Sequence, residues 1–194
     1  SGFVGNPNLK PEKSRGWDIG IDQTFFGGKA RVSATYFEAQ LKNEIETTFI
    51  TTNNIDGKSD RRGVELTLDA ALGDAVTLNA AYTYLDADED GVREIRRAPH
   101  IASLNLNYRF LERASATLSV RHNGEQDDTL FSLFGAQPVS IKAFTLVNLN
   151  ATYDLTENVQ FFGRVENLFD EKYEEVFSYR SPGIAAYAGI RARF

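Results

Sequence analysis

Apolar and polar residues alternate along most of the chain, so that every second side chain is apolar. The first such stretch holds Trp17, Ile19 and Ile21, and the next begins at Ala30 after a pair of glycines. Later copies begin near residues 64, 76, 102, 114, 147, 159 and 186. A period of two is that of a β-strand with one apolar face, and the helical period of 3.6 does not occur. The pattern predicts an all-β, antiparallel protein of about nine strands.

The opposite face of the predicted strands carries small polar residues and arginines. It comprises Thr77, Asn79, Thr83, Ser103, Asn105, Asn107, Arg109, Asn148, Asn150, Thr152, Arg191 and Arg193. Such a face suits the wet lumen of a transmembrane β-barrel. It equally suits the solvated face of a soluble β-sandwich, whose apolar residues point inward. Alternation alone therefore leaves both architectures open.

The connections between the predicted strands alternate in length. Short ones lie around Gly27, Gly73, Glu112 and Thr156, and long ones span roughly 42–60, 86–99, 124–142 and 168–183. Outer-membrane barrels have short periplasmic turns and long extracellular loops, whereas a sandwich has no reason to alternate so regularly. The connections favour an antiparallel transmembrane β-barrel segment.

Aromatic residues gather at both ends of the predicted strands. The short-turn ends hold Phe25, Phe110, Tyr153, Phe161 and Phe194, and the long-connection ends hold Trp17, Tyr36, Tyr82 and Tyr84. Two such bands are typical of the two membrane–water interfaces of a barrel. Aromatic residues that pack the core of a sandwich are the alternative, because strands are rich in them in any fold.

Composition and charge exclude several other classes of protein. Charged residues interrupt every apolar run before it reaches 18 residues, which excludes a transmembrane helix. The net charge of −6 comes without a basic patch and argues against a nucleic-acid partner. The absence of cysteine excludes disulfides and thiolate sites. The chain starts at Ser1 with no signal-peptide pattern, so we expect a targeting segment to lie upstream or to have been removed.

Several motifs along the chain resemble those of TonB-dependent outer-membrane receptors. They are Asn6-Pro7-Asn8-Leu9-Lys10-Pro11-Glu12, Arg62-Gly63-Val64-Glu65-Leu66, Glu166-Asn167-Leu168-Phe169-Asp170 with Tyr173, and Ser181-Pro182-Gly183 leading to Tyr187-Ala188-Gly189-Ile190 and Phe194. The resemblance implies a 22-stranded barrel with a plugged lumen, of which residues 1–194 would be the C-terminal part without the plug domain. It also implies that Phe194 is the signal read by the outer-membrane assembly machinery. An ordinary aromatic of the interfacial band is its other interpretation.

The function implied by this resemblance is uptake of a large chelate through the bacterial outer membrane, energised by the TonB complex through the missing plug. The ending resembles that of vitamin B12 receptors, which favours cobalamin slightly over a ferric siderophore. A passive porin and a soluble secreted β-sandwich binding module are the alternatives. Outer-membrane lipid, the assembly machinery and the chelate are the expected partners.

Residues that could carry chemistry are few, and we expect no enzyme, no cofactor and no catalytic residue. Asp86, Asp88, Asp90 and Gly91 match the first half of a calcium loop, but position twelve is Arg97 rather than a bidentate glutamate, and a solvated acidic tip is the favoured interpretation. The histidine at 122 is flanked by Ser119 and Asn123. Neighbouring strand residues point to opposite faces, so a catalytic triad is not expected there.

The predicted ligand surface is the long connection from Glu125 to Ser140. Its Phe131, Leu133 and Phe134 are too apolar for a tip that is merely solvated. Tyr179 and Arg180 in the last connection are further candidates. A loop folded back over the barrel mouth is the alternative interpretation.

Overall fold

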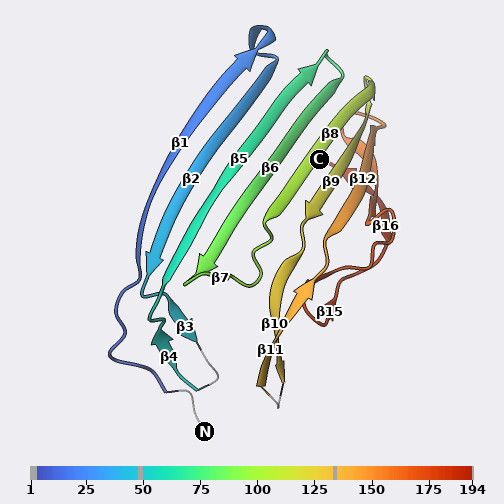
Figure 1. Cartoon of the computed structure of the whole chain (residues 1–194). Coiled ribbons are helices and arrows are strands. Elements are labelled where there is room, and N and C mark those ends of the chain that lie inside the picture. The colour runs from blue at the N-terminus through green and yellow to red at the C-terminus, as the bar shows by residue number, and fades with distance from the viewer. Residues whose placement is uncertain (1–3, 48–49, 133–134, 194) are drawn as a thin grey trace.

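Nine long strands form one antiparallel sheet in the computed structural model, which describes residues 4–47, 50–132 and 135–193 (Figure 1). They are β1 (Lys13–Phe25), β2 (Ala30–Lys42), β5 (Lys58–Leu72), β6 (Val76–Glu89), β8 (His100–Leu111), β9 (Ala114–Asn123), β12 (Phe144–Asp154), β13 (Val159–Glu166) and β16 (Ala185–Ala192). Each pairs with the next in this order, and the short β7 (Val92–Arg93) adds to β6. The expected all-β class and strand number are confirmed.

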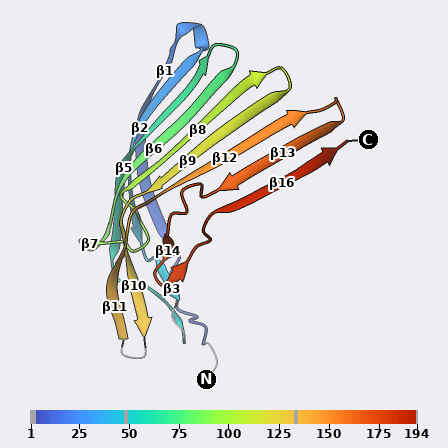
Figure 2. The same ribbon diagram turned by 90° about the vertical axis from the view of Figure 1, so that its right-hand side faces the viewer.

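The sheet is curved and open (Figure 2). β1 and β16 lie at its two ends, and both run from the long connections toward the short turns. The two strands are therefore parallel in direction, whereas all sequential neighbours are antiparallel. The sheet is open because β1 and β16 are not paired with each other.

Strand register places apolar residues side by side on one face of the sheet. One continuous row across six strands consists of Val32, Leu68, Ala80, Leu104, Val120 and Val147. Because side chains alternate between faces, the row one residue along lies on the other face. That row consists of Arg31, Asp69, Asn79, Asn105, Ser119 and Asn148. Every strand thus contributes to one apolar and one polar face.

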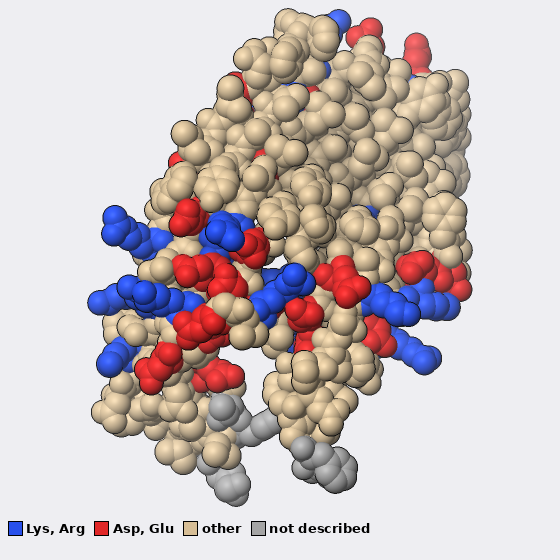
Figure 3. All heavy atoms as spheres, viewed as in Figure 1, with Lys and Arg blue, Asp and Glu red and all other residues tan. Residues whose placement is uncertain are grey.

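The polar face is cross-linked by hydrogen bonds between neighbouring strands. The Asn79 amide donates to Asp69 at 2.6 Å, and the Ser119 hydroxyl donates to Asn105 at 2.7 Å. Figure 3 shows Lys, Arg, Asp and Glu gathered in a dense band at the long-connection end, with few charged residues over the sheet between that band and the short turns. An apolar zone bounded by charge is the surface expected of a strand wall in lipid.

Aromatic side chains flank the apolar zone as predicted. Trp17 and Tyr36 have ring centroids 5.4 Å apart near the long connections, and both Phe25 and Phe110 are exposed at the short turns. Phe194 lies outside the described residues. Among those residues, no helix is long and apolar enough to cross a membrane.

The four short turns lie where the sequence predicts them, but the long connections contain strands of their own. They form the hairpins β3 (Ile45–Thr47) with β4 (Thr52–Asn54), β10 (Gln126–Ser132) with β11 (Gly135–Ile141), and β14 (Glu174–Val176) with β15 (Tyr179–Arg180). The strand β6 also runs further than predicted. Asp86 and Asp88 belong to it rather than to a loop, because their backbone pairs with that of β5.

Burial is concentrated at the long-connection end of the sheet. Apart from Ala114, the described residues that are buried all lie there: Ser59, Gly63, Ala87, Ala98, Asn123, Gly124, Gln126, Asp128, Ile141, Phe144, Leu146 and Asn167. The wall itself is a single layer whose two faces are open, so it has no interior of its own. The packed connections are consequently the part of the chain that can hold a shaped site.

Gly63 of β5 is a position where the wall tolerates no side chain. A Cβ there would meet the Tyr84 carbonyl oxygen of the next strand and lie 2.7 Å from the Phe37 ring. Gly163 of β13 has only the Tyr187 carbonyl oxygen nearby, at 3.9 Å. We therefore expect Gly63→Ala to lower the free energy of unfolding by about 1–3 kcal/mol through overpacking. Gly163→Ala is the matched control and should change it little. Urea unfolding of the whole receptor in lipid vesicles measures both, and equal effects would contradict this packing.

Candidate binding site at the long-connection end

The segment before β1 is tied to the first hairpin by asparagine side chains. The Lys10 amide donates to Asn54 Oδ1 at 2.7 Å, and Asn54 Nδ2 donates back to the Lys10 carbonyl at 2.8 Å. Asn6 Nδ2 donates to Asn53 Oδ1 at 3.2 Å. These hydrogen bonds hold the motif at residues 6–12 against β4. The two prolines of the motif did not predict this contact.

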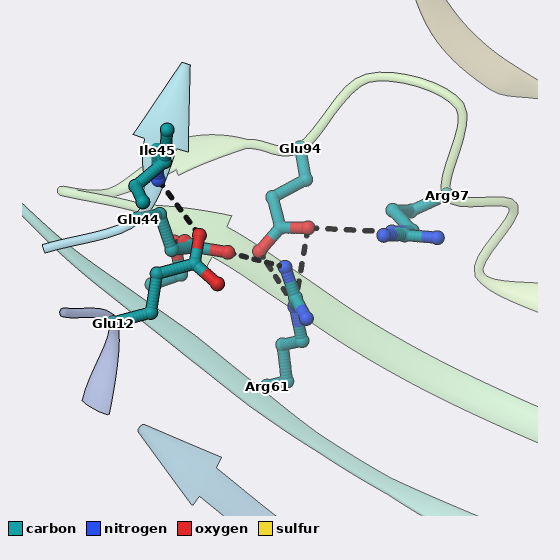
Figure 4. Close-up of polar contacts among 7 residues, drawn as sticks. Glu12, Glu44, Ile45, Arg61, Glu94 and Arg97 are labelled. Carbon is teal, nitrogen blue, oxygen red and sulfur yellow. Dashed lines mark hydrogen bonds and ion pairs between the residues drawn. The ribbon is translucent and has the colours of Figure 1, made fainter. Parts of the chain in front are cut away.

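An ion-pair cluster links this segment to two further connections (Figure 4). Arg61 of β5 donates to Glu94 Oε1 at 2.9 Å and to Glu44 Oε1 at 3.1 Å. Arg97 contacts Glu94 at 3.4 Å, and Glu12 accepts a bond from the amide of the first residue of β3 at 2.8 Å. Since Glu94 is only 11% exposed, the cluster is screened less than a surface pair. It holds the connections beside β5 and β6 in one arrangement.

Asp128 of β10 joins three separate segments. Its Oδ1 accepts bonds from Arg96 Nε and from the Thr129 amide, and its Oδ2 accepts one from the Phe177 amide, all at 2.8 Å. The Asp128 side chain is 0% exposed. Burial acts to raise the pKa of Asp128, but the Phe177 and Thr129 amides and the Arg96 guanidinium outweigh it, so the pKa lies below its ordinary value. The carboxylate therefore stays charged and connects the hairpin, the connection before β8 and the last connection.

The start of the last connection is organised by Asn167. Its amide donates to Asn148 Oδ1 at 2.8 Å, and its side-chain oxygen accepts from the Glu171 amide at 2.8 Å. Its Nδ2 donates to the carbonyls of Glu171 and Pro182. The backbone there has a φ of 48°, a conformation that asparagine adopts more readily than most residues. Asn167 thus closes the last connection into a compact loop.

That loop packs on the polar face of the wall. Phe144 lies on this face, because it alternates with Val147 and Leu149 of the apolar face along β12. Tyr173 stacks on Phe144 with ring centroids 4.6 Å apart. Arg121, also on the polar face, pairs with Glu175 at 2.7 Å. The last connection consequently turns over the mouth of the polar side.

The predicted ligand residues have different positions. Phe131 is 63% exposed near the end of the β10–β11 hairpin, whereas Phe134 and Leu133 lie outside the described residues. Tyr179 is 74% exposed on β15. Arg180, its neighbour, lines a cavity of about 560 Å³ between the last connection and the junction of β11 with β12. A role in ligand binding stays a prediction for all of them.

The candidate calcium loop has a different structure from the one its spacing suggests. Asp86 pairs with Arg62 at 2.8 Å, Asp88 accepts the Gly91 amide at 3.0 Å, and Asp90 accepts the Lys58 amide at 3.2 Å. Their carboxylates therefore serve strand and turn contacts instead of converging on one point. Within the described part of the chain, no group of three such ligands is placed to hold a metal ion.

The two histidines hold structural positions at strand ends. His122 at the end of β9 contacts Thr145 Oγ1 at 2.9 Å, and His100 at the start of β8 contacts the Tyr82 hydroxyl at 2.8 Å. The main residues that sequence reasoning missed are Asp128 and Asn167. Asn167 could have been found from its place in the Glu166–Asp170 motif, whereas the sequence holds no local signal for Asp128.

The wall with one apolar face, short turns at one end and interlocked connections at the other defines a segment of a transmembrane β-barrel. The family model described as TonB dependent receptor-like, beta-barrel, matches residues 1–168. This chain therefore belongs to the family of TonB-dependent receptor β-barrels. Members of this family are receptors of the Gram-negative outer membrane and not enzymes. The family therefore confirms the expected outer-membrane location and the expectation that the chain is not an enzyme.

Curated relatives share sequence over nearly the whole chain. The vitamin B12 transporter BtuB of Vibrio cholerae is 28% identical over 193 residues, covering 98% of this chain and 31% of that protein. The vitamin B12 transporter BtuB of Photobacterium profundum is 29% identical over 200 residues, covering 98% of this chain and 32% of that protein. This chain thus spans about a third of the length of these relatives.

Solved structures share the fold at lower identity. The pyoverdine outer-membrane receptor FpvA from Pseudomonas aeruginosa superposes with a TM-score of 0.82 at 21% identity, covering 96% of this chain and 30% of that one. The ferric-catecholate import receptor Fiu from Escherichia coli gives 0.79 at 19% identity, covering 97% and 29%. The likeness at these identities is one of fold.

Proposed function

We propose that residues 1–194 form the C-terminal part of a receptor whose whole barrel has 22 strands and a plugged lumen. The support is the order of the sheet, whose edges β1 and β16 are not paired with each other. An open edge in the hydrocarbon of a membrane would leave backbone groups without partners. Further strands of the same barrel would satisfy both edges. The plug domain, through which the TonB complex would act, would then lie outside this chain.

The whole receptor takes up a large chelate, cobalamin or a ferric siderophore, with energy from the TonB complex. The observation that carries this proposal is the buried Asp128, which ties three connections into one preorganised surface at the mouth of the polar face. Preorganised loops reduce the entropy lost when a bulky ligand binds. The names of the relatives support the same function, since they are vitamin B12 transporters and receptors for pyoverdine and ferric catecholate.

Two further partners follow from the proposal, outer-membrane lipid and the outer-membrane assembly machinery. Outer-membrane lipid covers the apolar face. The assembly machinery reads the terminal Phe194. Deletion of Phe194 from the whole receptor should therefore reduce its amount in the outer membrane.

Uptake measurements test the proposed function. Cells that carry the full-length gene as their only receptor of this type should accumulate radiolabelled cobalamin or a ferric siderophore, and loss of TonB should abolish the accumulation. A passive porin would give accumulation that does not depend on TonB. That result, or no accumulation of either class of chelate, would refute the proposal.

A further inference from the structure

The cavity beside the last connection has the dimensions of a ligand site. Its volume is about 560 Å³, within the range of roughly 300–1,000 Å³ that small-molecule sites have. The last connection supplies one wall, and the junction of β11 with β12 supplies the other. Charged and aromatic side chains line it: Lys142, Phe144, Glu171, Tyr173, Phe177 and Arg180.

Three cations line the cavity, and two of them, Lys142 and Arg180, differ from the third, Lys172. Lys172 is paired with Asp170 at 2.7 Å, and Arg121 with Glu175 at 2.7 Å. By contrast, neither Lys142 nor Arg180 has a side-chain hydrogen bond or ion pair with any residue that the structure describes. Both are exposed, so water solvates them in the absence of a ligand.

The acidic residues of the lining do not offset these two cations. Glu174 accepts the Ser178 amide at 2.9 Å, which occupies its carboxylate within the loop. Glu171 is the only other carboxylate that lines the cavity among the described residues. Two uncommitted cations therefore face one uncommitted anion, and the cavity has an excess of positive charge.

The aromatic wall of the cavity is Tyr173, and the buried Phe144 supports it. Phe144 is 4% exposed, and the Arg121 guanidinium lies 5.8 Å from the centre of its ring. The Tyr173 ring packs against Phe144 in a tilted arrangement, with centroids 4.6 Å apart and an interplanar angle of 39°. The backing by Phe144 restricts the Tyr173 ring before any ligand arrives. Aromatic faces bind flat rings of a ligand by offset or edge-to-face stacking.

We propose that this cavity binds an anionic oxygen-bearing group on a planar aromatic ring of the transported chelate, such as a deprotonated catecholate. Lys142 and Arg180 would donate charge-assisted hydrogen bonds to the oxygens, and Tyr173 would stack on the ring. The inference rests on the proposed function and refines it. It selects an anionic ferric chelate over cobalamin, whose cyano form has no net charge to match the two cations.

Binding measurements on the full-length receptor in detergent test the proposal with three probes. The first is a ferric tris-catecholate, which is anionic. The second is a ferric tris-hydroxamate, which carries no negative charge, and the third is cyanocobalamin. We expect the tris-catecholate to bind tightest and with an affinity that falls with salt. The double variant Lys142→Gln/Arg180→Gln should weaken its binding by about tenfold or more for each cation lost, and the other two probes should be unaffected.

A matched double variant removes the same charge elsewhere at this end. Lys42 and Lys58 face each other across β2 and β5, outside the cavity, and Lys42→Gln/Lys58→Gln should leave tris-catecholate binding within about twofold of the wild type. Tyr173→Leu keeps an apolar side chain but removes the ring, and should weaken the binding of the tris-catecholate alone. Heat-modified mobility in electrophoresis confirms that each variant is folded.

The outcomes separate this inference from the function on which it rests. Equal losses of tris-catecholate affinity in the two double variants would mean that extracellular charge attracts the chelate in general. That result would overturn the proposal that this cavity binds it. Tightest binding of cyanocobalamin or of the tris-hydroxamate, unchanged by Lys142→Gln/Arg180→Gln, would overturn it while uptake through the receptor stands. Failure of every chelate to bind, together with no TonB-dependent uptake, would refute both.

Discussion

Leu104→Arg is expected to reduce the folded yield of the whole receptor in lipid vesicles strongly. Leu104 lies in the middle of β8 on the apolar face, in register with Ala80 and Val120. An arginine at the midplane of the lipid face of a barrel costs about 2–4 kcal/mol. Leu149→Arg on β12 tests the same face on a second strand and should behave alike. The fraction that migrates as folded protein in electrophoresis after dilution into vesicles measures the effect.

Asn105→Arg is the control for this result, because it places the same side chain one residue away on the polar face. There it joins a row that already holds Arg31 and Asp69, and water or the plug can solvate it. Its folded yield should stay near that of the wild type. Equal yields of the two arginine variants would show that the assignment of the faces is wrong.

Asp128→Ala is expected to release the last connection from the hairpin without unfolding the wall. The substitution leaves the Arg96 guanidinium and the Thr129 and Phe177 amides without their common acceptor. Arg96 is half-exposed and can be solvated, so the main loss is that of the acceptor of the two amides, and each buried donor left without a partner costs about 1–3 kcal/mol. Hydrogen exchange of the Phe177 amide in the whole receptor should accelerate by about a hundredfold or more, while amides of β6 and β8 keep their protection.

Asp127→Ala provides a neighbouring control. Asp127 contacts Arg93 at 3.8 Å, and both side chains are largely exposed, so the pair contributes about 0–1 kcal/mol. Its carbonyl, which accepts the Arg96 amide, is kept in the variant. Exchange at Phe177 should change little. A large effect of Asp127→Ala, or none of Asp128→Ala, would contradict the central position of Asp128.

Acid should act on this network as the substitution does, but only at low pH. The folded-state pKa of Asp128 is lowered, so its stabilisation is complete above the unfolded pKa of about 3.9 and is lost as the pH falls through the folded value. Protection factors of the Phe177 amide should therefore be constant from neutral pH down to about 5 and fall only below about 4. A loss between pH 7 and 5 would point to a different group.

The hydrogen bonds of Asp128 and the proposed ligand cavity both involve the last connection. Phe177 contributes its amide to Asp128 and also lines the cavity with Tyr173. Loosening of the Asp128 contact should therefore reach the cavity wall through a short stretch of backbone. This coupling offers a physical route by which the hairpin and the connection before β8 affect how cargo is held.

The sequence by itself determined the wall of this protein. Alternation is a local property of the pleated strand, and sequential antiparallel pairing needs only a turn between neighbours, so strand number, faces and short turns are readable from the chain. Trp17 and Tyr36, for example, meet across β1 and β2 because alternation and one short turn place them there. The motif at Glu166–Asp170 is likewise a local feature of the sequence, and it indicates the family without any long-range contact.

Only the tertiary structure decided how the long connections fold. Asp128 meets Arg96 from 32 residues away and Phe177 from 49 residues away, and no periodicity links positions so far apart. The same holds for the cavity, since Lys142 and Arg180 approach one space only after Asn167 has closed the last connection. The spacing of Asp86, Asp88 and Asp90 matched half of a calcium loop and favoured a solvated acidic tip, and it could not show that pairing with β5 makes Asp86 and Asp88 part of a strand. Side-chain contacts between connections depend on the packing of the whole end of the sheet, and that packing is not a local property of the chain.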